Sequence, residues 1–187
     1  MKKIERLVIT MVEIICEGPK LLLRRAEESD LEYILGLEYD HENIRYIYPF
    51  DREEQLEVIH GADTMDVIVV EKETGEEAGY FMVKDIKSRD MALELTHVII
   101  GKKGKGYGHE ALKLMKRWAF EELKFHRVWL DCKEYNDRAL HLYEAEGFKR
   151  EGIIRECLLT HGVFENLVVL GILDREYFSR KSEGQEF

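Results

Sequence analysis

The chain has 187 residues, which is enough for one well-buried domain and too few for two of ordinary size. Hydrophobic residues make up 45% of it and charged residues 35%, a globular balance that excludes extensive disorder. The formal net charge of −10 argues against nucleic acid as the main partner, because phosphate binding needs a basic face, and it favours a cationic small molecule.

Residues 1–19 are predicted to be an N-terminal extension. They resemble a secretory signal only briefly, because Glu5, Glu13 and Glu17 interrupt the apolar run and no cleavage-site pattern follows. No segment of the sequence approaches the roughly 20 apolar residues that span a bilayer. We therefore expect a cytoplasmic protein without membrane contacts.

The cysteine pattern indicates neither a disulfide framework nor a metal centre. Cys16, Cys132 and Cys157 are far apart and form no C-x-x-C pair, and the histidines show no metal-ligand spacing. Free cysteine is commonly buried, so we expect three buried reduced thiols and no bound metal.

In chain order, the first predicted element is a short strand over residues 20–26. A helix is expected from Ser29, because Ser29 and Glu32 have the S-x-x-E spacing of a capping box before an apolar pattern of helical period. A second, shorter helix is predicted after Pro49, with Asp51 as its N-cap.

The period of the apolar residues then changes from helical to strand-like. Three apolar, β-branched or alternating runs follow at 66–71, 77–84 and 91–100, separated by the polar turns "KETGEE" and "IKSRD". Strands joined by such short polar connections pair with their neighbours, so we predict a three-stranded antiparallel meander.

The next segment predicts a helix, a strand and another helix. Residues 109–125 carry apolar side chains at three- and four-residue spacing, which is typical of an amphipathic helix. A short strand is expected over 127–132. The segment "NDRALHLYEAEGF" then predicts a helix with Asn136 as N-cap and Gly147 as its left-handed terminator.

The C-terminal part predicts two more strands around a turn at His161 and Gly162. The charged residues 179–187 are expected to form a mobile tail. Residues 20–178 are therefore predicted to form the single domain, with elements in the order β α α β β β α β α β β.

The glycine-rich stretch "KKGKGYGHEAL", residues 102–112, leaves a predicted strand and opens a predicted helix. Glycines let backbone N–H groups turn toward an anion, and the helix N-terminus adds partial positive charge, so this is a candidate phosphate site. A Walker loop is excluded because Tyr107 follows Gly106, and a dinucleotide fingerprint because His109 stands where glycine is needed. The alternative is a tight turn with solvated lysines.

A second segment strengthens the functional interpretation. Asn136 opens its predicted helix, and Tyr143 follows seven residues later, two turns on and therefore on nearly the same face. The tyrosine hydroxyl can then point toward whatever the asparagine binds. The alternative is that Tyr143 is an ordinary core aromatic residue.

Together, "KKGKGYGHEAL" and "NDRALHLYEAEGF" resemble two motifs of the GNAT family of N-acetyltransferases. In that family [RQ]-x-x-G-x-[GA] holds the pyrophosphate of acetyl-CoA, and N-x-x-A-x-x-x-Y-x-x-x-G-F supplies a coenzyme contact and a catalytic tyrosine. The resemblance covers residues 20–178 and is nearest to the branch with ribosomal-protein N-terminal and spermidine acetyltransferases. It implies an α/β (α+β) fold with a mixed, mostly antiparallel sheet of six to seven strands, splayed around acetyl-CoA, with helices on both faces.

The resemblance also implies where the co-substrate acetyl-CoA binds. Backbone amides of the fourth strand would contact the pantetheine arm and thioester, the glycine-rich loop would hold the pyrophosphate, and Asn136 would hydrogen-bond the pantetheine amides. These positions are Val98, Ile99, Ile100, Lys103, Gly104, Lys105, Gly106, Tyr107, Gly108, His109 and Asn136. The sequence departs from the motif at Lys103, which keeps the charge of an arginine but not its planar fork. The short link "IIGKK" between the predicted fourth strand and the glycine-rich loop is a second departure from the family pattern.

Tyr143 is implied as the general acid, because a phenol is well matched in pKa to a departing thiolate. For the general base, Glu94 and His97 are both candidates, and strand alternation sends them to opposite faces unless a bulge intervenes. We favour Glu94, with a packed strand histidine as the alternative reading of His97.

These residues predict direct acetyl transfer from acetyl-CoA to a primary amine, such as a polyamine, a protein N-terminus or another small amine. The acidic runs at 38–42 and 51–54 lie in the region that forms the acceptor wall in this family, and they are either solvated faces or an attraction for a cationic amine. A catalytically silent acyl-CoA-binding or regulatory module on the same fold is the alternative. A homodimer is compatible with the sequence.

Overall fold

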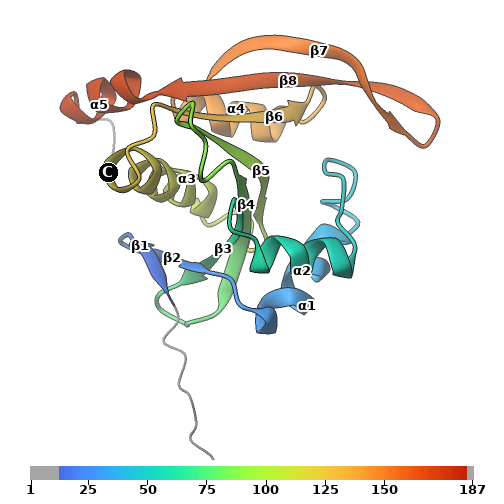
Figure 1. Ribbon diagram of the computed structural model, residues 1–187, viewed down its shortest axis with the longest axis horizontal. Helices are drawn as coiled ribbons and strands as arrows, with labels where there is room; N and C mark the ends of the chain where they lie inside the picture. The colour runs from blue at the N-terminus through green and yellow to red at the C-terminus, as the bar shows by residue number, and fades with distance from the viewer. Residues whose placement is uncertain (1–12, 185–187) are drawn as a thin grey trace, which may run out of the picture.

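An eight-stranded sheet with the order β1-β2-β3-β4-β5-β6-β8-β7 runs through the computed structural model, which describes residues 13–184 (Figure 1). The strands are β1 (Ile14–Glu17), β2 (Leu21–Arg25), β3 (Thr64–Glu71), β4 (Glu77–Lys84), β5 (Ala92–Ile100), β6 (Arg127–Lys133), β7 (Lys149–Thr160) and β8 (Val163–Leu173). All neighbouring strands are antiparallel except β5 and β6. The predicted mixed, mostly antiparallel sheet is therefore confirmed.

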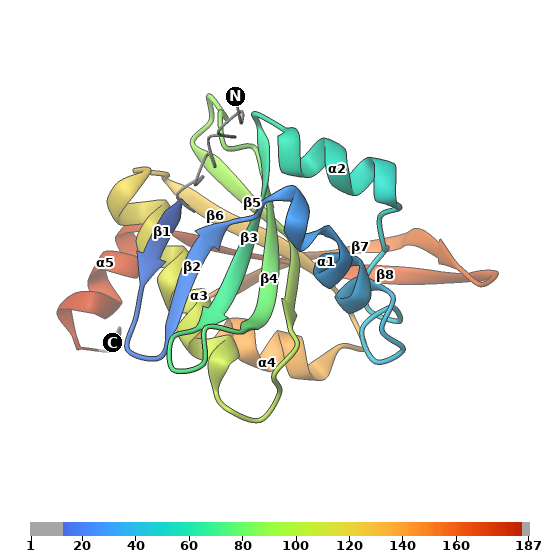
Figure 2. The ribbon, with the colours of Figure 1, turned by 90° about the horizontal axis from the view of Figure 1, so that it is seen from below.

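Helices cover both faces of the sheet (Figure 2). They are α1 (Leu31–Glu38), α2 (Arg52–His60), α3 (Tyr107–Arg117), α4 (Asp137–Ala145) and α5 (Asp174–Ser182), with a 3-10 turn at Glu28–Asp30 and a π-helical turn at Trp118–Glu122. One apolar core joins α3, α4 and α5 to the sheet, and a second joins α1 and α2 to the opposite face. Among residues 13–184, no helix is long and apolar enough to cross a membrane.

The sheet opens between β5 and β6. These parallel strands pair only along Ala92–Glu94 and Arg127–Trp129, while β5 stays paired with β4 as far as Ile100 and β6 stays paired with β8 as far as Lys133. The two halves of the sheet therefore diverge toward the end of β5. The splayed sheet predicted from the sequence is present, and the opening lies beside the glycine-rich loop.

A β-bulge in β5 changes which side chains face α1 and α2. Met82 pairs with His97 and Val83 pairs with Leu95, so Thr96 is an extra residue in the ladder. One extra residue sends all following side chains to the other face. Leu95 consequently packs in the core with α3, whereas His97 lies on the face of α1 and α2.

The strand count exceeds the six to seven strands predicted. The additional strand is β1, which lies within residues 1–19 and pairs with β2 across a turn in which Gly18 N–H donates to Leu21 C=O at 2.8 Å. The signal was the turn "EGPK" between two apolar runs, which favours a hairpin. Residues 1–12 of the predicted extension lie outside the described residues.

Two other boundaries differ from the sequence prediction. Ser29 is not the N-cap of α1, because Glu28–Asp30 form a 3-10 turn in which the Asp30 carboxylate accepts from the Glu27 N–H at 2.8 Å and pairs with Arg24. Residues 179–182 of the predicted tail belong to α5, and residues 185–187 lie outside the described residues.

Most other local predictions are confirmed. Asp51 caps α2 by accepting from the backbone N–H of Glu53 and Glu54, each at 2.9 Å, and Asn136 caps α4. His161 and Gly162 have positive φ angles of 49° and 82°, so they form the tight turn of the β7–β8 hairpin.

Candidate active site

The glycine-rich loop between β5 and α3 forms one wall of a cavity of about 460 Å³, and α4 forms the other. Gly106 precedes α3 with φ at 77°, a left-handed conformation that favours glycine, and its lack of a Cβ leaves the N-terminus of the helix open. The lining residues are Ile100, Lys102, Lys103, Gly104, Gly106, Tyr107, Gly108, His109, Arg138, His141, Leu142 and Ala145. An open helix N-terminus with lysines and an arginine around it fits a phosphate-containing ligand.

Two lysines of the loop bind Glu71 through their ammonium groups, although Lys102 also lines this cavity. Lys105 Nζ lies 2.8 Å from one Glu71 oxygen and Lys102 Nζ lies 2.6 Å from the other, while the Tyr107 hydroxyl also donates to this carboxylate. These hydrogen bonds, with that from Lys102 the strongest, hold the pKa of Glu71 well below its usual range. Of the predicted coenzyme residues in the loop, Lys105 does not line the cavity within the described chain.

His109 belongs to the same wall and leads into a buried polar contact. Its Nδ1 lies 2.8 Å from Oε1 of Glu146, and Lys116 Nζ donates to the Glu146 backbone C=O at 2.7 Å. The Glu146 side chain is buried, so this network fixes the end of α4 against α3, through one residue near each end of α3.

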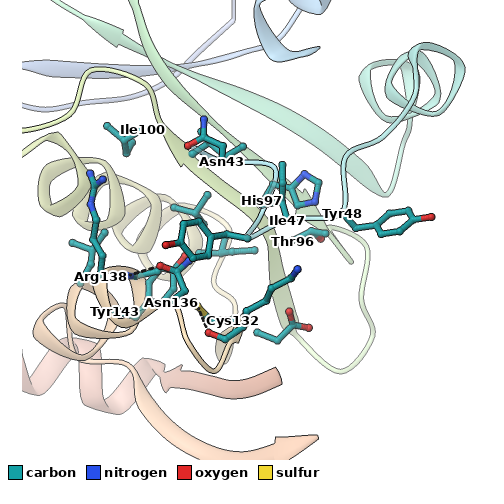
Figure 3. A pocket seen from close by; sticks show the side chains of 18 of the residues that line it. Asn43, Ile47, Tyr48, Thr96, His97, Ile100, Cys132, Asn136, Arg138 and Tyr143 are labelled. Carbon is teal, nitrogen blue, oxygen red and sulfur yellow. Dashed lines mark hydrogen bonds between the residues drawn. The ribbon is translucent and has the colours of Figure 1, made fainter. Parts of the chain in front are cut away.

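A second cavity, of about 330 Å³, lies where β5 and β6 diverge (Figure 3). It adjoins the first cavity, because Ile100, Lys103, Arg138 and Leu142 line both. Its other lining residues come from the segment between α1 and α2, from β5 and β6, from the start of α4 and from the β7–β8 hairpin: Glu42, Asn43, Tyr46, Ile47, Tyr48, Phe50, Leu95, Thr96, His97, Val98, Ile99, Asp131, Cys132, Lys133, Asn136, Ala139, Tyr143, Leu158 and Leu167.

The predicted residues Asn136 and Tyr143 meet in this second cavity. The Asn136 side chain accepts from the Ala139 N–H at 3.3 Å, and this bond leaves its amide NH₂ for another partner. Among the described residues the Tyr143 hydroxyl makes no hydrogen bond, and burial raises the pKa of Tyr143 above that of a free phenol. Tyr143 is therefore a neutral proton donor at the wall of a cavity.

Three consecutive residues of β6 add polar groups to this cavity. Burial raises the pKa of the Asp131 carboxyl and raises that of the Cys132 thiol to about 12, so Cys132 is an unreactive thiol. The Lys133 ammonium is neutralised by Glu165 at 2.8 Å and donates to the Arg45 C=O at 3.0 Å.

The prediction of three buried thiols is correct for Cys16 and Cys132 and wrong for Cys157, which is exposed in the bulged part of β7.

Glu94, the residue favoured as base, is not among the residues that line either cavity in the described chain. Its carboxylate accepts from the Thr96 hydroxyl at 3.0 Å, and burial raises its pKa. Because of the bulge at Thr96, Glu94 and His97 lie on the same face of the sheet, which the sequence alone left open.

His97 lines the cavity and has buried partners that sequence reasoning missed. Its Nδ1 lies 2.6 Å from Oε1 of Glu38 and 2.9 Å from the hydroxyl of Tyr80. Glu38 is the first residue of the acidic run 38–42, which was expected to be a solvated face or an acceptor wall. The sequence signal was weak, because only the packing of α1 against β4 and β5 brings these residues together.

Within residues 13–184, no group of three or more histidine, cysteine, aspartate or glutamate residues has the arrangement of a metal site. The polar groups of the two cavities instead comprise the open N-terminus of α3 with its cationic side chains, a phenol, an amide and an imidazole. Such groups are suited to binding a phosphorylated carrier and to transferring protons.

Comparison with known proteins agrees with this chemistry. Residues 20–149 match the acetyltransferase (GNAT) domain family. The spermidine N(1)-acetyltransferase of Escherichia coli K12 is 27% identical over 171 residues, which cover 87% of this chain and 91% of the relative.

Two solved structures of the spermidine N-acetyltransferase from Vibrio cholerae are also similar. The complex with CoA and spermine has a TM-score of 0.77 at 25% identity and covers 86% of this chain and 99% of the relative. The dodecameric structure in an intermediate state has a TM-score of 0.74 at 25% identity, and the match covers 87% of this chain and 99% of the relative. With the family match over most of its length, the chain belongs to the GNAT acetyltransferase family and is an N-acetyltransferase that uses acetyl-CoA to acetylate an amine.

Proposed function

We propose that the acceptor is a polyamine such as spermidine or spermine. The observation that carries this proposal is the cavity between β5 and β6, which adjoins the phosphate cradle and is walled in part by the Asp131 carboxylate. The two lysines that line the same cavity are already neutralised, Lys133 by Glu165 and Lys103 by Glu42, so the Asp131 carboxylate is left for a cationic ligand. The net charge of −10 and the activity of the spermidine acetyltransferase relatives support the same acceptor class.

Within this site we assign the coenzyme contacts as the sequence predicts. The loop from Lys103 to His109 holds the pyrophosphate, the backbone of Val98, Ile99 and Ile100 faces the thioester, and Asn136 binds the pantetheine amides. Support comes from the lining of the two cavities, which includes all of these residues except Lys105. Lys105 remains a predicted contact that needs to leave Glu71 first.

Tyr143 is proposed as the general acid that protonates the departing thiolate. Its neutral, buried hydroxyl and its place in the cavity support this role. The role of Glu94 as general base stays a prediction, supported by its raised pKa, and a proton would have to reach it through an intervening group because its side chain lies outside the cavity wall.

The experiment that tests the proposed acceptor is thiol release from acetyl-CoA across a panel of amines. The panel contains spermidine, spermine, an aminoglycoside and peptides with N-terminal alanine and serine. We expect the highest kcat/KM with the polyamines, and we expect Asp131→Asn to raise the KM for spermidine more than the KM for acetyl-CoA. A preference for the peptides would contradict the polyamine assignment.

We also propose that the protein self-associates through the β7–β8 hairpin. This hairpin extends past the rest of the molecule in Figure 1, and Leu159 and Phe164, which pair directly across it, are 62% and 63% exposed. Apolar side chains exposed on an edge ribbon favour association with another chain. The dodecameric structure of the Vibrio cholerae relative supports an assembly of several chains, whereas the homodimer that the sequence left possible stays a prediction. We place it in the cytoplasm, where the buried thiols of Cys16 and Cys132 stay reduced.

A further inference from the structure

His97 and Glu38 form a buried imidazole–carboxylate pair at the wall of the acceptor cavity. Nδ1 of His97 lies 2.6 Å from Oε1 of Glu38, and the two side chains are 6% and 0% exposed. The pair joins residues 59 positions apart, one at the end of α1 and the other in β5. A buried carboxylate beside an imidazole is costly to build unless its polar atoms are hydrogen-bonded, so the position of this pair beside a cavity requires an explanation.

The hydrogen bonds around Glu38 determine which nitrogen of His97 carries the proton. Oε1 accepts from the Tyr80 hydroxyl and from Nδ1 of His97, and Oε2 accepts from the backbone N–H of Phe50 at 2.7 Å. Burial, followed by the neighbouring Glu38 carboxylate, raises the pKa of Tyr80, so the phenol remains a donor. Because Nδ1 donates to a carboxylate, the neutral ring carries its free lone pair on Nε2.

Packing holds the ring in place and leaves Nε2 available. The Phe50 ring meets His97 edge-on with 5.5 Å between centroids, and the Tyr80 ring meets it edge-on at 6.4 Å. Within residues 13–184, no hydrogen bond joins Nε2 to another protein group. Figure 3 shows His97 near Thr96 and Tyr48, while Tyr143 comes from α4 on another wall of the same cavity.

Two further charged groups, on β6 and β4, lie near His97. Asp131 faces it from β6, and a charge on His97 lowers the pKa that burial raises for this carboxyl. Lys84 on β4 lies over the Phe50 ring and acts on the same Asp131. The carboxylates of Glu38 and Asp131 therefore surround an imidazole that can accept a proton.

We propose that His97 is the general base of this acetyltransferase and that Glu38 is the residue that positions it and stabilises its imidazolium. The inference rests on the proposed transfer of acetyl to a protonated amine. It assigns to His97 the task predicted for Glu94, which has no place on the cavity wall in the described chain.

The proton balance of the reaction involves His97 and Tyr143 together. A primary ammonium must lose two protons to become an amide N–H. Nε2 of His97 takes the first, and the lone pair that this frees attacks the thioester carbon. The C–N bond forms, the C–S bond breaks and Tyr143 protonates the leaving thiolate. The second proton of the nitrogen then restores Tyr143, and His97 releases its proton to water.

The experiment compares the pH dependence of kcat and kcat/KM for His97→Asn and Glu38→Gln with that of the wild type. We expect His97→Asn to lower kcat by about 10²-fold or more and to abolish the acid limb of the profile, as the loss of a general base does. We expect Glu38→Gln to move the acid limb to lower pH, because an amide no longer stabilises the imidazolium. Addition of imidazole should restore part of the activity of His97→Ala, which a purely structural role of His97 would not allow.

His60 provides a matched control. Its Nε2 lies 2.7 Å from Oε1 of Glu28 in an exposed pair, and His60 lines neither cavity, so His60→Asn should leave the profile unchanged. Calorimetric binding of CoA verifies that each variant is folded. A His97→Asn variant with a wild-type acid limb would overturn the proposal, and so would an acid limb that disappears in Glu94→Gln instead. If the wild type ignores spermidine but acetylates another amine of the panel, the proposed acceptor fails while the same comparison still tests His97.

Discussion

Lys103, at the arginine or glutamine position of the coenzyme motif, is bound to the carboxylate of Glu42 on the acceptor side of the site. The ion pair joins the glycine-rich loop to the segment between α1 and α2, and it lowers the pKa of Glu42. If the pyrophosphate of acetyl-CoA binds the Lys103 ammonium as proposed, Glu42 is released into the cavity that it lines. We therefore expect the binding of the two substrates to be coupled through this exposed ion pair.

The first prediction concerns this pair. Glu42→Gln frees Lys103 for the coenzyme, so we expect a few-fold lower KM for acetyl-CoA with little change in kcat, since exposed ion pairs contribute little. We expect Lys103→Ala to raise the same KM. Initial-rate kinetics at saturating spermidine measure both effects. A higher KM for acetyl-CoA in Glu42→Gln would contradict the competition between Glu42 and the pyrophosphate.

The second prediction concerns the left-handed glycine at the start of α3. Gly106→Ala places a Cβ at φ 77°, which costs about 1 kcal/mol of strain and distorts the phosphate cradle. We expect a higher KM for acetyl-CoA. Gly75→Ala is the matched control, because Gly75 has φ 73° and equally open surroundings in the β3–β4 turn and lines neither cavity. Gly75→Ala should lower Tm to a similar extent without changing the KM for acetyl-CoA. An equal rise in this KM for both variants would contradict the role of Gly106 in phosphate binding.

The third prediction concerns pH-dependent stability. Asp66 is buried in β3, and burial raises its pKa to about 8, from 3.8, despite a hydrogen bond from Gln55. Because the folded state holds the proton more tightly, the stabilisation is fully present below pH 3.8 and is lost as the pH rises through about 8, by at most about 1.4 kcal/mol per pH unit. Urea unfolding between pH 6 and 8.5 should show a smaller pH dependence for Asp66→Asn than for the wild type. If the free energy of unfolding of the wild type and of Asp66→Asn depended on pH in the same way, Asp66 would not be protonated in the folded state.

The fourth prediction concerns assembly. Replacement of both Leu159 and Phe164 by serine removes the exposed apolar pair of the β7–β8 hairpin, and we expect a smaller species in sedimentation velocity. Phe178→Ser is the control, because Phe178 is 45% exposed on α5, away from the hairpin. An unchanged sedimentation coefficient for the double variant would place the interface elsewhere.

The sequence was sufficient for the elements that local patterns determine. The alternation in 66–100, the amphipathic pattern of α3 and the caps Asp51 and Asn136 depend on neighbours within one turn or strand, and the structure confirms them. The same holds for the glycine-rich loop, whose spacing alone separated it from the two nucleotide motifs. Local periodicity and capping are the strongest signals a single sequence carries.

The features that were missed depend on long-range packing. The bulge at Thr96 has no signature in "ELTHVII", because register is decided by the partner strand β4. Without it, Glu94 and His97 were assigned to opposite faces. Glu38 was read as part of a surface run, yet the fold buries it completely against His97 and Tyr80.

The edge strand β1 was missed for a different reason. Its four residues stand in an apolar segment that resembles a signal sequence, and only pairing with β2 shows that Cys16 belongs to the core. Short edge strands have little local propensity, so their place in a sheet is determined by the hairpin turn that precedes the next strand.

The central claim is that this chain transfers acetyl to an amine with Tyr143 as the acid. The measurement that tests it most directly is thiol release from saturating acetyl-CoA with spermidine, for the wild type and Tyr143→Phe. The variant keeps the ring that packs against Phe148, so CoA binding should be unchanged in calorimetry. We predict turnover by the wild type and a kcat lower by about 10²-fold or more in Tyr143→Phe, the usual contribution of a general acid. A kcat in Tyr143→Phe equal to that of the wild type would contradict the account.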